Sequence, residues 1–401
     1  MRQRSKTKRL ADWIRCRGGT VHPHLNIFQE KSDGDRVVVA ERPIAKGEVL
    51  IRLTSTSYFD ARAQKLPTAF SEKGFIHAAL CTMSYILVKG KDDAYVQCLK
   101  GANVHPSDDE IVSKLLSGSS IAEEYVARKP EMTLWYEGKL RKNVLKYPDI
   151  WPCDEERIDG MFERVCDLVR SRGFYDEQNR GPFMLPGMDM LNHCNDAKRT
   201  STTLYTENSK DGIAFVMIAE RDIKESEEIT HTYVEMTDSE LFMTYGIVND
   251  QSVVVPRISR SLICRAMKEE LSESFGETTM KELGETILSK MENQCKTLMP
   301  RGFVSLCEFG DFGVHNALLN IATVLCDHDD DAASLMCRIY KLSLETFDSG
   351  VRRDDQDLLS SSFHCAAFTL ARREYVVLKS AYKSALHYYS SVVRRRDTSA
   401  A

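Results

Sequence analysis

The sequence predicts an α+β protein in which a β-domain is split by a helical insert and followed by an all-helical C-terminal domain. Segments rich in β-branched residues occur in residues 21–70 and again in residues 171–255. Between them lie about a hundred residues in which apolar side chains recur at helical spacing. Beyond residue 256 the strand signals fade and helical periodicity continues. A chain of 401 residues is also longer than one hydrophobic core usually serves.

Composition excludes several classes of protein. Apolar residues make up 42% of the chain, charged residues 28%, and the net charge is −5, so nothing points to nucleic acid or to an anionic membrane. The 12 cysteines form no CxxC pair, which argues against a zinc site and favours reduced, buried thiols. The longest apolar run, residues 75–88, is too short and too polar to span a bilayer. We therefore expect a metal-free protein of the cytoplasm, the nucleus or both.

The first elements are a helix and two strands. A helix within residues 1–20 ends at Gly18 and Gly19, a typical C-terminal stop. Residues 37–40 and 48–53 have the composition of short strands, and residues 44–47 form the turn between them.

The helical insert covers residues 71–170. Its clearest helix spans residues 154–170, because Asp154 is a good N-cap and an apolar stripe follows it. Strands are predicted again at residues 202–205, 213–218 and 229–234.

Two stretches of the β-segments echo each other. Residues 40–49 are matched by residues 219–228, and both are predicted to form strand, tight turn and strand. Two similar β-pieces on either side of an insert indicate one split β-domain and not a repeat array.

The C-terminal half is predicted to be a separate helical domain over residues 256–401. Its helices are expected at residues 261–271, 279–298, 314–325, 332–347 and 356–394. We expect a break in the last of these, because so long an uncapped helix is unusual in a globular domain.

Four short clusters occur in a fixed order along the second β-segment. The first contains Ser171, Arg172 and Phe174, and the second contains Asp189, Asn192 and His193. The third runs over residues 227–233 and ends at Tyr233, and the fourth is Tyr245, Gly246 and Ile247.

In this order and spacing the clusters resemble the SET-domain methyltransferases of the Rubisco large-subunit lysine methyltransferase type. That subgroup shows S-R-x-F, D-x-x-N-H, G-E-E-x-x-x-x-Y and a closing Y-G-F. The resemblance covers about residues 8–250 by motif, and beyond them it is architectural, because a helical substrate-binding domain follows the SET domain in this family. It implies a SET-type β-fold and a monomeric protein-lysine N-methyltransferase that uses S-adenosyl-L-methionine and docks a protein substrate on the helical domain.

The resemblance also implies roles for individual residues. Tyr233 takes the catalytic position, where its hydroxyl would orient the methyl group and the incoming nitrogen and stabilise developing charge. The expected cofactor-binding residues are Gly34, Asp35, Arg36, Ser171, Asp189, Asn192, His193, Tyr233 and Ile247. The expected substrate-binding residues are Arg172, Phe174 and Tyr245.

The chemistry constrains such a site. A lysine amine has a pKa near 10.4 and must arrive neutral, because an ammonium has no lone pair. Asn192 and His193 offer donors and acceptors that match an adenine edge and an amino-acid end. An aromatic wall at Phe174 suits the aliphatic stem and the cation of lysine.

Three positions depart from the family pattern. The E-G-x-G segment has Gly34, Asp35 and Arg36 without the second glycine, Ile247 replaces an aromatic residue, and Ser226 replaces the glycine of G-E-E. The missing second glycine and Ile247 favour one alternative, a catalytically degenerate SET-fold interaction module. A second alternative is a protein-histidine methyltransferase, which Phe174 disfavours.

Overall fold

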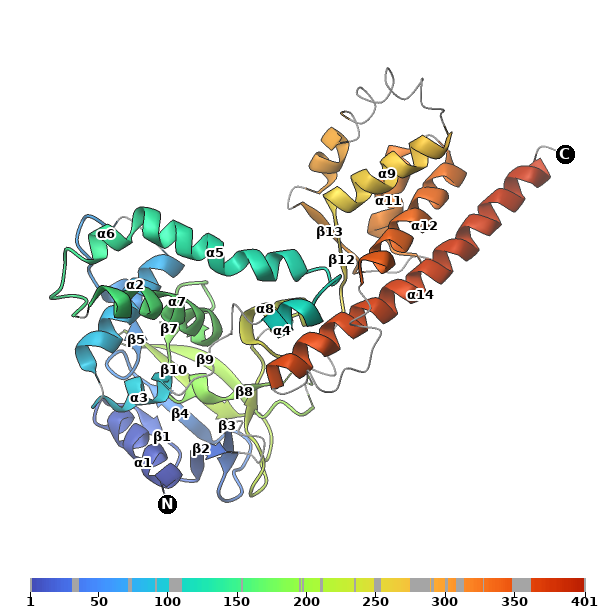
Figure 1. The fold of residues 1–401 in the computed structure, drawn as a ribbon. Coiled ribbons are helices and arrows are strands. Elements are labelled where there is room, and N and C mark those ends of the chain that lie inside the picture. The colour runs from blue at the N-terminus through green and yellow to red at the C-terminus, as the bar shows by residue number, and fades with distance from the viewer. Residues whose placement is uncertain are drawn as a thin grey trace. The chain divides into compact units, whose positions relative to one another are not determined.

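The computed structural model describes residues 2–30, 36–70, 74–90, 92–100, 110–152, 154–194, 196, 198–209, 212–233, 236–248, 254–274, 289, 292–299, 302–307, 314–326, 328–347 and 362–399. The chain forms two compact units (Figure 1). The first unit combines Met1–Pro106 with Pro130–Glu235, and the second combines Ser107–Lys129 with Met236–Ala401.

The first unit is built on a six-stranded sheet in the order β1-β4-β10-β9-β11-β8. Its strands are β1 (Thr20–Val21), β4 (Val49–Leu53), β8 (Asn192–His193), β9 (Thr202–Ser209), β10 (Gly212–Ala219) and β11 (Thr230–His231). The long hairpin β9–β10 is antiparallel, and β11 pairs with β8 in parallel, with Thr230 opposite Asn192. This parallel pair joins the second motif of the sequence to the third.

Two smaller sheets and a set of helices complete this unit. The sheets are β2 (Leu25–Glu30) with β3 (Arg36–Ala40), and β5 (Phe59–Asp60) with β7 (Phe183–Met184) and β6 (Gly173–Phe174). The helices are α1 (Arg2–Arg15), η1 (Ala61–Ala63), α2 (Phe75–Lys89), α3 (Ala94–Lys100), α6 (Arg141–Val144), α7 (Glu155–Arg172) and η2 (Met188–Met190); α5 (Ala122–Lys139) begins in the second unit.

Helix α7 forms where its sequence predicts. The Asp154 side chain accepts from the Arg157 backbone N–H at 2.9 Å, which confirms the predicted N-cap. The helix packs against α2 through a buried stripe that includes Phe162 and Val165. It runs directly into β6 at Gly173 and so fixes the start of the strand that carries Phe174.

The sequence echo has a structural counterpart in the pairing of these two segments. β3 pairs with β2 and β4 with β1 and β10, so the strands before and after the first turn lie in different sheets. Instead, the two echoing segments pair with each other. Ile44 and Ile223 exchange two backbone hydrogen bonds, of 3.0 and 2.9 Å.

The contacts on either side of this pair are reciprocal. Ser226 N–H donates to the Ala40 carbonyl, and Gly47 N–H donates to the Ala219 carbonyl, each at 2.8 Å. The turn residues correspond as well, because Gly47 has φ +86° and Ser226 has φ +63°. Each turn therefore bonds to the end of the strand that precedes the other turn. The two β-segments on either side of the insert thus belong to one β-domain.

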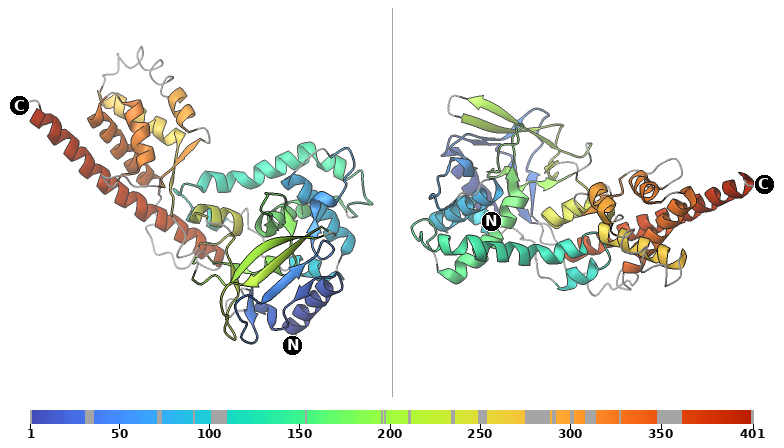
Figure 2. Two further views of the ribbon diagram at one scale, coloured as in Figure 1. Left: turned by 180° about the vertical axis from the view of Figure 1, so that it is seen from behind. Right: turned by 90° about the horizontal axis from the view of Figure 1, so that it is seen from above.

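The second unit is mainly helical, with α4 (Glu110–Leu115), α8 (Asp238–Tyr245), α9 (Arg260–Ser274), α11 (Asn316–Leu325), α12 (Asp329–Thr346) and α14 (Ser362–Ser399). α12 lies along α14, and their buried residues include Ile339, Leu378 and Ala381 (Figure 2). A short antiparallel pair, β12 (Arg257–Ser259) with β13 (Phe303–Ser305), adds strands to the part predicted to be all-helical.

The predicted α+β class, with strands divided by a helical stretch and followed by helices, is confirmed. The predicted break in the last helix is wrong, because α14 continues for 38 residues. Its buried face, which includes Ala367, Leu370 and Ala385, supports it as far as Ala385. No helix in the described part of the chain is long and apolar enough to cross a membrane.

The compact units also divide the chain differently from the predicted domains. Residues 107–129 fall in the predicted insert but group with the second unit. The reason is packing: Val112 and Tyr125 belong to a core with Phe242 and Leu370.

Candidate active site

A short segment, residues 188–193, organises the candidate site. It consists of η2 and β8, and Gly187 precedes it with φ +86°. A Cβ atom on Gly187 would lie 3.1 Å from the Ile51 side chain, so this turn sits tightly on the sheet. Strand β8 is then held by its parallel pairing with β11.

Arg172, at the end of α7, reaches this segment with its guanidinium group. Nη1 donates to the Asp189 carbonyl oxygen at 2.5 Å and lies 3.4 Å from the Met190 sulfur. The Arg172 side chain is only 16% exposed. In the described residues its Nε and Nη2 groups make no hydrogen bond, so donors remain for a ligand.

The Asp189 carboxylate lies beneath the guanidinium group and is fully buried. It accepts from the Tyr95 hydroxyl at 2.8 Å and from Gly187 N–H at 3.2 Å, and its Oδ2 lies 3.9 Å from Arg172 Nη1. Burial raises the pKa of Asp189 to about 6, and the nearby Arg172 charge opposes the rise. All these contacts are internal, so the carboxylate holds the segment and Arg172. Its predicted contact with the cofactor stays a prediction.

Asn192 joins three segments that are distant in sequence. Its Nδ2 group donates to the Arg36 carbonyl at 3.1 Å and to Glu228 Oε1 at 2.8 Å. Both amide protons are thereby used. Among the described residues no donor reaches its Oδ1, which remains an acceptor for a ligand.

His193 and Tyr233 form a pair. The Tyr233 backbone N–H donates to His193 Nδ1 at 3.1 Å, and the two rings lie 4.9 Å apart at 32°. Because Nδ1 accepts, the neutral ring carries its proton on Nε2. The Tyr233 hydroxyl donates to the Leu191 carbonyl at 2.5 Å, so its oxygen is fixed on the same segment.

Phe174 approaches the strand that leads to Tyr233. Its half-buried ring lies 6.2 Å from that of His231. Burial lowers the pKa of His231 to about 4, and the hydrogen bond to Thr202 at 3.1 Å opposes this shift. The imidazole is therefore neutral at pH 7 and adds no positive charge beside Phe174.

Arg36 contributes its backbone carbonyl to the site, where it accepts from Asn192. Burial raises the pKa of the Cys98 thiol to about 12, Asp189 adds to the rise, and Arg36 and Arg172 both oppose it. The predicted contact of the Arg36 side chain with the cofactor stays a prediction.

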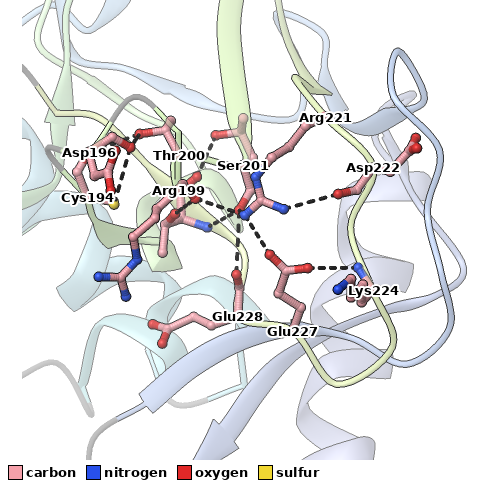
Figure 3. Close-up of polar contacts among 12 residues, drawn as sticks. Cys194, Asp196, Arg199, Thr200, Ser201, Arg221, Asp222, Lys224, Glu227 and Glu228 are labelled. Atoms are coloured by element: carbon pink, nitrogen blue, oxygen red, sulfur yellow. Dashed lines mark hydrogen bonds and ion pairs between the residues drawn. The ribbon is translucent and has the colours of Figure 1, made fainter.

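Arg221 fixes the turn that carries Glu228 (Figure 3). Its Nη2 group forms an ion pair with Glu227 Oε1 at 2.5 Å and donates to the Arg199 carbonyl at 2.9 Å and to Ser201 Oγ at 3.3 Å. Glu227 also accepts from the Lys224 backbone N–H at 2.8 Å. The partner of Asn192 therefore stands on a rigid turn.

Five other residues are predicted for the site. The Ser171 hydroxyl donates to the Asp167 carbonyl of its own helix at 2.8 Å. Gly34 and Asp35 lie outside the described residues. Tyr245, whose pKa burial raises to about 12, and the exposed Ile247 belong to the second unit. The proposed roles of these five residues stay predictions.

Sequence reasoning missed three residues that complete the cluster. Glu228 and His231 lie inside the third motif, where the resemblance assigned a role only to Tyr233. Tyr95 gives no signal in the sequence, because its partner Asp189 is 94 residues away.

Comparison with known proteins agrees with this picture. Residues 35–234 match the SET domain family model. The N-lysine methyltransferases setd6 of Salmo salar and Danio rerio are each 24% identical to this chain, over 143 and 151 residues. Those alignments cover 33% and 34% of this chain and only 30% and 31% of the relatives.

Solved structures match over nearly the whole chain. The SET domain of LSMT bound to lysine and AdoHcy superposes with a TM-score of 0.70 at 14% identity, covering 97% of this chain and 92% of that one. Rubisco LSMT bound to AdoMet gives a TM-score of 0.66 at 14% identity, covering 96% and 93%. At this identity the likeness shows the fold.

The matched domain, the predicted SET-type fold and the motifs gathered on residues 188–193 lead to one conclusion. This chain belongs to the SET-domain family.

Proposed function

We propose that this protein transfers a methyl group from S-adenosyl-L-methionine to a lysine side chain of another protein. One observation carries the proposal: Arg172 and Tyr233, predicted from separate motifs, both bond to residues 188–193, the segment that contains Asn192 and His193. The lysine methyltransferases among the similar proteins support the choice of acceptor.

The free donors and acceptors suit the cofactor. Its amino-acid end carries an ammonium and a carboxylate, which match the Asn192 Oδ1 acceptor and the remaining N–H groups of Arg172. When bound, the cofactor supplies an electrophilic methyl group on a sulfonium, whose positive charge also favours a neutral amine nearby.

The chain's residues would then position the acceptor. The Tyr233 hydroxyl, donating its proton to Leu191, turns its lone pairs away from that carbonyl and toward an incoming N–H. The half-buried Phe174 ring offers a surface for the lysine stem. The lysine nitrogen held there would take the methyl group through its lone pair and release a proton to water, and the electrons of the C–S bond would remain on sulfur.

Cofactor binding is the first test. Calorimetric titration of the purified protein with S-adenosylmethionine should give saturable binding. Asn192→Ala should weaken it by about tenfold or more, because the ties to Arg36 and Glu228 are lost. The control is Asn208→Ala, an exposed asparagine of β9, which should bind as the parent does. A parent protein that does not bind at millimolar cofactor would leave only the interaction-module alternative.

The acceptor is tested separately. Cell lysate is incubated with the protein and radiolabelled cofactor, and the labelled proteins are hydrolysed to amino acids. Label in methylated lysine supports the proposal, and label in methylhistidine would replace lysine by the histidine alternative.

A further inference from the structure

We propose that a basic face of α14 binds an acidic segment of the protein substrate. That this partner is a substrate rests on the proposed function. This face, called the α14 stripe, consists of Arg372, Val376, Lys379, Lys383, Leu386 and Arg394. All six side chains are exposed.

The stripe follows from helical spacing. Its members are separated by four, three, four, three and eight residues, which places them on one side of an α-helix. The opposite side carries Leu378, Ala381 and Ala385, all buried in the core of the second unit. At 1.5 Å per residue the stripe is about 33 Å long, enough for an extended segment of about ten residues.

The charge of the stripe has one sign. α14 contains seven basic residues and two acidic ones, Glu374 and Asp397. Glu374 is 1% exposed and accepts from Ser120 and Ser239, so it is turned away from the stripe.

Two cations on other sides of α14 have carboxylate partners. Arg373 Nη1 lies 2.9 Å from Asp238 Oδ2, and Arg396 forms an ion pair with Asp330. Over the described ranges, no carboxylate forms an ion pair with Lys379, Lys383 or Arg394.

This arrangement costs stability within the molecule. Lys379 and Lys383 are four residues apart on one helix, where like charges repel by a few tenths of a kcal/mol. An acidic partner would remove this repulsion, and in a chain of net charge −5 such a patch steers acidic segments to one face.

The apolar members of the stripe favour a protein over nucleic acid. Val376 is 58% exposed and Leu386 is 42% exposed, each between cations. Phosphate contacts need only cations, whereas an acidic peptide with apolar side chains would bury both surfaces. The expected partner is therefore a segment in which Asp or Glu alternates with a few apolar residues.

Binding to a synthetic probe tests the stripe without any methyl transfer. A fluorescein-labelled peptide of about 20 residues, with Glu and Leu at the complementary spacing, is titrated with the full chain and followed by anisotropy. We expect saturable binding that weakens with added salt, and binding about tenfold weaker when Gln replaces every Glu. Lys379→Glu combined with Lys383→Glu should also weaken it by about tenfold or more.

A second double variant controls for overall charge. Lys268→Glu with Lys296→Glu changes the net charge by the same amount at two exposed lysines of the same unit, outside the stripe. Equal weakening by both double variants would overturn the proposal, because total charge would then explain the binding. A single-stranded oligonucleotide of about 20 nucleotides that binds the stripe more tightly than the peptide would also overturn it.

The outcome is separable from the proposed function. Cofactor titration of the stripe variant should match the parent, since the stripe contains none of the residues anchored on residues 188–193. Failure of the peptide to bind with normal cofactor binding would reject the stripe alone. Failure of the parent to bind cofactor with intact peptide binding would reject the enzyme and leave the stripe as an interaction surface.

Discussion

At the scale of single residues, the Tyr233 hydroxyl separates a catalytic role from a structural one. Tyr233→Phe removes a hydrogen bond to Leu191 and should cost about 1 kcal/mol of stability. If the hydroxyl orients the reacting groups, turnover should also fall by about 100-fold or more while cofactor affinity is kept.

The control for this change is Tyr58→Phe. The Tyr58 hydroxyl donates to the Ile213 carbonyl at 3.0 Å, the same kind of bond in the same unit. Urea unfolding should show similar losses of stability in the two variants. Methyl-transfer assays should show a loss of turnover only in Tyr233→Phe. Equal turnover in the two variants would remove Tyr233 from catalysis.

His231 predicts a pH dependence of stability. Its folded pKa of about 4 lies below the ordinary value of 6.5, so the unfolded chain binds a proton that the folded chain does not. Its contribution is therefore complete above pH 6.5 and is lost as the pH falls toward 4. Between pH 7 and 4.5 the loss amounts to about 2 kcal/mol.

His231→Gln should remove this loss. Glutamine can still bond to Thr202 but does not titrate in this range. The free energies of unfolding of both proteins in urea at pH 7 and 4.5 give the difference directly. The same pH sensitivity in both would show that another group, such as His315, is responsible.

Much of this cluster could be predicted from the sequence because its members lie in short motifs. Asn192 and His193 are adjacent, and Tyr233 follows a recognisable strand. Tyr95 could not be found, since the bond to Asp189 exists only after α3 packs beside η2. The raised pKa of Asp189 was equally hidden, because burial depends on the whole fold.

At the scale of elements, exchanging glycine and serine between the two echoing turns should change stability in opposite directions. Gly47 and Ser226 occupy equivalent places with positive φ, and left-handed backbone disfavours residues with a Cβ. Ser226→Gly should stabilise the protein by about 1 kcal/mol, and Gly47→Ser should destabilise it by about the same amount.

Side-chain contacts do not complicate this pair. A Cβ on Gly47 meets nothing within 4 Å, and Ser226 is exposed. Urea unfolding of the two variants measures the effect. Destabilisation in both would mean that the turns are not equivalent.

The sequence predicted most elements but not how the strands pair. Periodicity identified β9, β10 and α7, because local alternation and caps are visible within ten or twenty residues. It gave no sign of how the two echoing segments pair, because the Ile44–Ile223 bridge joins residues that lie 179 positions apart (223 − 44).

At the scale of the whole molecule, residues 107–129 show why domain boundaries are hard to predict. They look like part of one helical insert, yet Ser120 donates to Glu374, 254 residues later in the chain. Val112 and Leu116 are buried with Ala367 and Leu370 of α14. No local pattern in the sequence identifies a packing partner so far away.

A substitution at Gly118 tests whether residues 107–129 contribute to the stability of the second unit. It has φ +84°, and a Cβ there would lie 2.3 Å from Phe347 Cα and 2.5 Å from the Thr346 carbonyl oxygen. Because both are backbone atoms, Gly118→Ala must displace the segment from the end of α12. We expect a loss of more than about 3 kcal/mol. Gly90→Ala has a similar φ of +67° and open space, so it should cost only about 1 kcal/mol.

Hydrogen exchange resolves where the loss occurs. In Gly118→Ala the amides of α12 and α14 should exchange faster, while those of β4, β9 and β10 keep their protection, because the strands belong to the other unit. Faster exchange confined to residues 110–126 would show that the segment is a local attachment, and the division of the chain into these two units would then fail as an account of its stability.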